Sequence, residues 1–114
     1  MPYLLVQTNQ KIAPAEQAAA LGKLSKITAE LLGKSERYVM VALQPDTPLL
    51  FAGDSRPVAY LELKSIGLPV ERTAELSQGL CQAVEDLLGV PGERVYIEFA
   101  DAARPLWGWN GRTF

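Results

Sequence analysis

The sequence has 114 residues, with 11 basic and 13 acidic side chains, a net charge of −2 and a hydrophobic content of 48%. This is the composition of one globular domain with no basic surface for nucleic acid, and the lack of a signal peptide or membrane-spanning run predicts a cytoplasmic protein. The absence of histidine and the single cysteine, Cys81, exclude histidine-dependent nucleophiles, zinc sites built from histidine or cysteine, and an internal disulfide.

The first predicted element is an apolar strand over residues 3–8, which Pro2 precedes. Proline has no N–H to donate to a sheet ladder, so its position needs an explanation. One explanation is that Pro2 belongs to a disordered chain start. The other is that Met1 is removed after synthesis, which would leave a free secondary amine on Pro2, in a direction fixed by its ring.

A helix is predicted next, with Pro14 in its first turn and Gly33 at its end. A second strand follows over residues 38–43, and a loop rich in Pro, Gly and Asp spans residues 44–57. The apolar stripe of the helix has the expected spacing of three and four residues and consists of Leu21, Leu24, Thr28 and Leu31.

The second half of the chain repeats this order. LLGKSERYVMV at residues 31–41 matches LLGVPGERVYIEF at residues 87–99. A strand over 58–66, a helix from Pro69 to Gly89 and a strand over 95–100 complete the second unit. We therefore predict a single α/β domain over residues 1–114, built from two βαβ pseudo-repeats at about 2–56 and 57–114. Its four strands should form one mixed sheet with two helices on one face. The stripe of the second helix consists of Leu76, Leu80, Val84 and Leu87.

The strand at residues 38–43 points to a partner. It reads YVMVAL, which is typical of a strand buried on both faces. Two helices cover only one face of a four-stranded sheet, so other subunits are expected on the second face. The alternative is that short buried strands simply have this composition, but we predict a homo-oligomer.

Five segments stand out in register with the repeat: P-Y-L-L-V-Q-T-N at the start, G-K before YVMV, S-I-G at 65–67, R-V-Y-I at 94–97 and G-W-N-G-R-T-F at the end. Together they resemble the family of macrophage migration inhibitory factor and D-dopachrome tautomerase within the tautomerase superfamily. The resemblance implies a homotrimer with active sites between subunits. It also implies an isomerase, a keto–enol tautomerase acting on phenylpyruvate-like or dopachrome-like substrates with Pro2 as the base.

The chemistry of Pro2 can be argued without the resemblance. Removing a proton from the carbon beside a carbonyl needs a base whose pKa lies near the ambient pH. An α-amine has a pKa of about 8, and burial lowers that value because it disfavours the cation. No cofactor is needed for this reaction, which agrees with the absence of cofactor motifs.

The resemblance also assigns binding residues. Lys34 matches the position that binds the substrate carboxylate, although a lysine at a helix end is often only a solvated cation. Ile66 matches a pocket wall, or else is plain core. Tyr96 matches a residue that the neighbouring subunit contributes. Tyr38 and Phe114 match aromatic residues of the pocket rim, although Phe114 could instead be part of a frayed terminus.

This chain departs from the family pattern at three places. Glu98 stands where better-known members have asparagine, and its carboxylate near the pocket would repel an anionic substrate. Trp107 replaces a small residue and would narrow the pocket. Val58 and Leu61 stand where some members carry a cysteine pair, so a dithiol activity has no support.

Two other functions remain open from the sequence. One is a hydratase or dehalogenase of the same superfamily, in which protonated Pro2 acts as the acid and Glu98 activates water. The other is a non-enzymatic, cytokine-like interaction protein that keeps the pocket as a relic.

Overall fold

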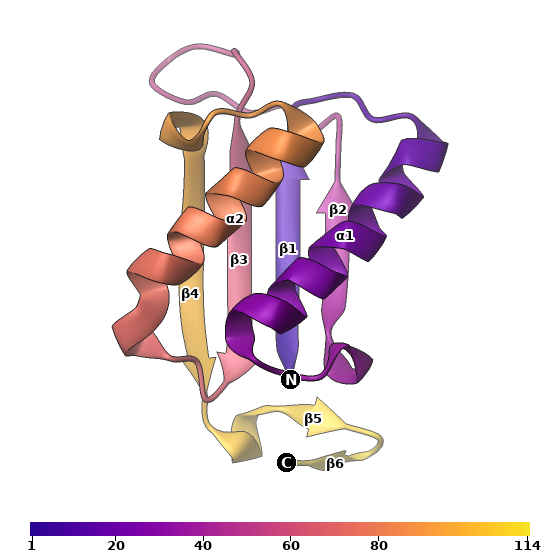
Figure 1. Ribbon diagram of the computed structural model, residues 1–114, viewed down its shortest axis with the longest axis vertical. Helices are drawn as coiled ribbons and strands as arrows, with labels where there is room; N and C mark the ends of the chain where they lie inside the picture. Colours follow the sequence, from indigo (N-terminus) through magenta and orange to yellow (C-terminus); the bar gives the residue numbers. More distant parts are fainter.

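The computed structural model describes all 114 residues as two helices packed on one face of a four-stranded sheet (Figure 1). The first unit contains β1 (Pro2–Thr8), α1 (Pro14–Leu32) and β2 (Met40–Gln44). The second contains β3 (Ala59–Ile66), α2 (Thr73–Leu88) and β4 (Val95–Ala102). The predicted class, repeat and mixed sheet are confirmed.

The sheet has the order β2-β1-β3-β4. Within each unit the two strands are parallel and joined by a helix, while β1 and β3 meet antiparallel at the centre. Parallel neighbours need such a crossover connection, which the helices supply. In the central pairing Pro2 lies opposite Ser65, so the start of β1 and the end of β3 share one end of the sheet.

Both helices end where glycine adopts a left-handed conformation. Gly33 has φ of 63° and Gly89 has φ of 69°, values that side chains with a Cβ rarely tolerate. A third glycine, Gly79, allows a close approach between the helices, because a Cβ at this position would lie 2.6 Å from the Leu31 side chain.

The core lies between the helices and the inner face of the sheet. Leu4, Leu61, Leu24 and Leu80 are fully buried there. Thr28 is buried too, and its hydroxyl donates a hydrogen bond to the carbonyl of Leu24. The predicted apolar stripes of the two helices were only partly right, because Leu21, Leu31 and Leu87 are half-buried. The helix residues that are buried instead are Ala20, Ala29, Leu32, Ala83 and Leu88.

Short elements replace some of the predicted ones. Residues Glu36–Tyr38 form a 3₁₀ turn, so the second strand begins at Met40, and another turn at Val70–Arg72 precedes α2. The chain ends in a turn at Arg104–Leu106 and a small hairpin of β5 (Gly108–Trp109) and β6 (Arg112–Thr113). This hairpin was not predicted, because two-residue strands carry no periodicity. Asn110 and Gly111 form its loop, both with positive φ, which is a frequent hairpin combination.

The second face of the sheet carries no helix, as predicted. Alternate residues of each strand point to it, including Tyr3 and Leu5 of β1, Met40 of β2 and Tyr96 of β4. Met40 and Tyr96 are each 66% exposed in the single chain. None of the helices is long and apolar enough to cross a membrane.

Candidate functional site

A pocket of about 290 Å³ lies at the end of the sheet where β1 begins. Figure 1 shows why distant segments meet here: the N-terminus, the turn before β2 and the β5–β6 hairpin all lie at this end. The walls are mostly hydrophobic, as is usual for small-molecule sites. The lining residues are Met1, Pro2, Tyr3, Arg37, Tyr38, Val39, Met40, Trp107, Gly108, Trp109 and Phe114.

Pro2 is fully buried at the inner wall of this pocket. The terminal amine, which belongs to Met1 in the structure, has a pKa lowered from the ordinary α-amine value. The main cause is burial, which removes water from the ammonium form, and the second cause is the charge of Lys34. This place in the fold therefore favours an uncharged amine, which is the form that accepts a proton.

Lys34 is positioned by the helix end that precedes it. The backbone turns at Gly33, and the Lys34 N–H bonds to the carbonyl of Ala29 at 3.0 Å. The Lys34 ammonium then donates hydrogen bonds to the Ser65 hydroxyl at 3.0 Å and to the Ile66 carbonyl oxygen. Because Ser65 pairs with Pro2 across the sheet, Lys34 is held at the pocket end of β1.

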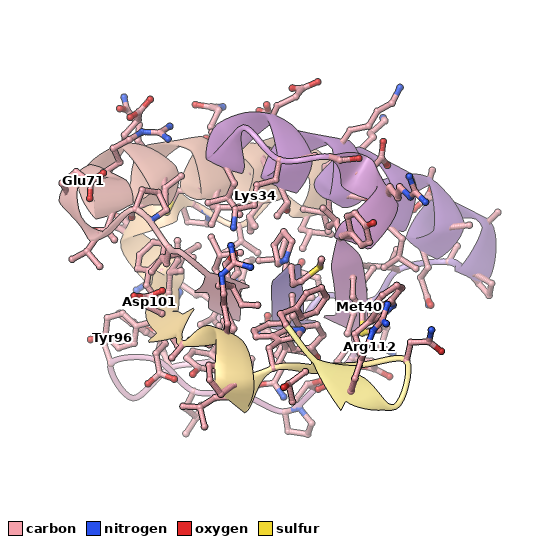
Figure 2. The ribbon with its side chains drawn as sticks, turned by 90° about the horizontal axis from the view of Figure 1, so that it is seen from below. Lys34, Met40, Glu71, Tyr96, Asp101 and Arg112 are labelled. Carbon is pink, nitrogen blue, oxygen red and sulfur yellow. The ribbon has the colours of Figure 1, made fainter.

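Two opposing effects act on the Lys34 ammonium. Burial lowers its pKa, and the carboxylate of Asp101 partly opposes that effect. Asp101 also accepts a hydrogen bond from the Leu68 N–H at 3.0 Å, which fixes the carboxylate. Figure 2, which looks at this end of the molecule, places Lys34 between Asp101 on one side and Met40 and Arg112 on the other. A half-buried ammonium of this kind pairs readily with an anion.

Aromatic side chains form the outer wall. Tyr38 meets Trp109 edge to face, with the ring centroids 6.2 Å apart. Phe114 stacks on Trp109 with a centroid distance of 5.7 Å, and its N–H donates to the Trp107 carbonyl. The alternative of a frayed terminus at Phe114 therefore does not describe this structure. Sequence reasoning missed Trp109, although the Asn110-Gly111 dipeptide could have predicted the hairpin that brings it here.

Four predicted residues do not line the pocket of the single chain: Lys34, which is held beside it, and Ile66, Tyr96 and Glu98. Ile66 sits next to Ser65, is half-buried and contributes its carbonyl to Lys34. Tyr96, at the start of β4, lies towards the other end of the sheet. There its ring packs against the Phe51 ring, with the two centroids 4.9 Å apart. Glu98 is exposed on the face without helices, paired in register with Glu62. Neither Tyr96 nor Glu98 lines the pocket of the single chain.

The sequence model of macrophage migration inhibitory factor matches residues 1–114. The chain belongs to the macrophage migration inhibitory factor family. The rat protein of that name is 35% identical over 115 residues, covering 100% of this chain and 99% of the relative. A macrophage migration inhibitory factor homolog from Trichuris trichiura is 35% identical over 117 residues, and the match covers 100% of both chains.

Solved structures of the family have the same fold. The macrophage migration inhibitory factor homologue of Prochlorococcus marinus has a TM-score of 0.91 at 43% identity, with 98% of each chain covered. The factor from Trichinella spiralis has a TM-score of 0.89 at 32% identity, covering 98% of this chain and 99% of that one. The family predicted from the sequence is thus confirmed over the whole chain.

Proposed function

We propose that the chain is a cofactor-independent keto–enol tautomerase for phenylpyruvate-like compounds, with the amine of Pro2 as general base once Met1 is removed. The observation that carries the proposal is the buried Pro2 at the wall of an aromatic pocket where a terminal amine has a lowered pKa. A lowered pKa increases the share of the uncharged amine near neutral pH, and this is the form that abstracts a proton beside a carbonyl.

The other residues take roles that match their positions. Lys34 pairs with the carboxylate of the substrate, since its ammonium is already oriented by Ser65 and Ile66. The aromatic ring of the substrate packs against Tyr38 and Trp109. The Pro2 amine removes a proton from the carbon next to the carbonyl and becomes an ammonium. The carbonyl oxygen takes a proton from water, and the ammonium returns its proton to the resulting hydroxide, which gives the enol and restores the free amine. The reverse sequence gives the ketone.

The proposal includes a homotrimer with sites between subunits. The face of the sheet without helices carries exposed apolar residues such as Met40 and Tyr96, which another subunit would cover. In such an assembly Tyr96 and Glu98 of one subunit would complete the pocket around Pro2 of the next. This arrangement accounts for the absence of both residues from the pocket of a single chain.

The test is a phenylpyruvate ketonisation assay on protein whose N-terminus is verified by mass spectrometry. Pro2→Gly leaves a terminal amine, now a primary one, but loses the fixed direction of the ring, so kcat should fall substantially while the fold remains. The matched control is Pro48→Gly, an exposed loop proline, which should leave kcat unchanged. Undiminished activity in protein that retains Met1 would refute the role of Pro2, because its nitrogen is then an amide.

A further inference from the structure

Two arginines stack on the aromatic side chains that form the outer wall of the pocket, and of the two only Arg37 lines the pocket itself. Arg37 lines the pocket, and the carbon of its guanidinium group is 5.4 Å from the centroid of the Tyr38 ring. Arg112, which follows the Asn110–Gly111 turn, places the same carbon 5.3 Å from the centroid of the Trp109 ring. Because these two rings contact each other, both guanidinium groups belong to one aromatic cluster. In Figure 2 Arg112 lies on the same side as Met40, a pocket residue.

Neither guanidinium group is neutralised within the chain. The four ion pairs of the structure involve other cations, namely Arg56, Lys64, Arg72 and Arg94. The side chains of Arg37 and Arg112 also donate no hydrogen bond to another protein group, whereas Arg94 donates four to carbonyl oxygens. Their N–H donors remain free to bind a ligand.

Stacking on an aromatic ring restrains an arginine without using its donors. The guanidinium group is a planar fork whose geometry matches a carboxylate. A side chain that is already restrained loses less entropy on binding. Arg37 and Arg112 are therefore arranged to bind an anion at the outer, aromatic side of the pocket, while Lys34 is held by Ser65 and Ile66 at the end of β3.

We propose that Arg37 and Arg112 bind a second anionic group of the ligand, so that the pocket prefers aromatic keto acids that carry a further carboxylate on the ring. The inference rests on the proposed function in one respect, which is that Lys34 takes the first carboxylate. The aromatic ring then spans the space between the two anion sites. Compounds with a single carboxylate bind with only one of the two sites occupied.

The experiment compares binding of cinnamate and 4-carboxycinnamate, neither of which has an enolisable carbonyl. Quenching of tryptophan fluorescence reports binding, because Trp107 and Trp109 line the pocket. The parent protein should bind the dicarboxylate roughly tenfold more tightly, which corresponds to about 1.4 kcal/mol. In the double variant Arg37→Gln, Arg112→Ser this preference should disappear, while the affinity for cinnamate stays nearly the same.

Two control variants test whether the preference for the dicarboxylate depends on the positive charges of Arg37 and Arg112 in particular. Replacing both arginines by lysine keeps the charges and should keep most of the preference. Lys11→Gln removes one exposed positive charge away from the pocket and should leave the preference intact. Equal binding of the two ligands by the parent protein would overturn the inference, as would an equal loss of both ligands in the double variant.

The outcome also separates this inference from the tautomerase proposal. A protein that turns over phenylpyruvate without preferring the dicarboxylate would contradict only the second anion site. A protein that prefers the dicarboxylate without turning over phenylpyruvate would contradict only the tautomerase.

Discussion

Replacing Arg94 with methionine should destabilise the fold through the loop at residues 51–57. Arg94 is only 4% exposed. Its guanidinium group donates hydrogen bonds to the carbonyls of Pro57 at 2.9 Å, Arg56 at 3.1 Å, and Phe51 and Asp54 at 3.2 Å each. It also lies over the Phe51 ring, with its carbon 5.2 Å from the centroid. One buried side chain thus holds the whole loop.

The magnitude follows from which carbonyls can recover water. The side chains of Arg56 and Asp54 are 68% and 41% exposed, so we expect their carbonyls to hydrogen-bond to water when Arg94 is lost. The carbonyls of Phe51 and Pro57 belong to half-buried residues and are rehydrated less easily. At about 1.5 kcal/mol for each hydrogen bond from a charged donor, we expect a loss of about 3 kcal/mol. That is a large share of the stability of a domain of this size.

The assay is equilibrium unfolding in urea at one fixed protein concentration, since assembly adds to apparent stability. Arg56→Met is the matched control, because Arg56 belongs to the same loop and pairs with the same Asp54 but has a 68% exposed side chain. It should change the midpoint little. The reasoning is refuted if Arg94→Met loses less than about 1 kcal/mol, or no more than the Arg56 control.

Three further predictions concern the site. Lys34→Gln should raise the KM for phenylpyruvate. It should also shift the rising limb of the pH–rate profile to higher pH, because the Lys34 charge helps to lower the pKa of the terminal amine. An unshifted limb would mean that this charge does not act on the base. Glu98→Asn should raise kcat/KM for phenylpyruvate a few-fold, since it removes a negative charge proposed to face the substrate carboxylate; a clear decrease would instead favour the hydratase. Sedimentation velocity should report a trimer at micromolar concentration, and a stable folded monomer would contradict the proposed intersubunit site.

The sequence alone determined the elements and their arrangement in two units. Strands and helices are set by local rules, such as the periodicity of apolar residues, and so they could be read directly. Pro14 begins α1 and the left-handed glycines Gly33 and Gly89 end both helices, as predicted. The resemblance to the family rested on the same local motifs, and the comparisons confirm it. Pro2, Tyr38, Trp107 and Phe114, which the sequence proposes as site residues, all line one pocket in the structure.

Only the tertiary structure decided which side chains surround that pocket and which face of each helix is buried. Leu31 is half-buried because α1 lies against α2 at Gly79, a contact that no periodicity within one helix encodes. Arg112 and Arg37 meet the same aromatic cluster although most of the chain separates them in sequence. The physical reason is strand pairing: because β1 lies between β2 and β3, the ends of three strands converge, and the C-terminal hairpin closes the space beside them.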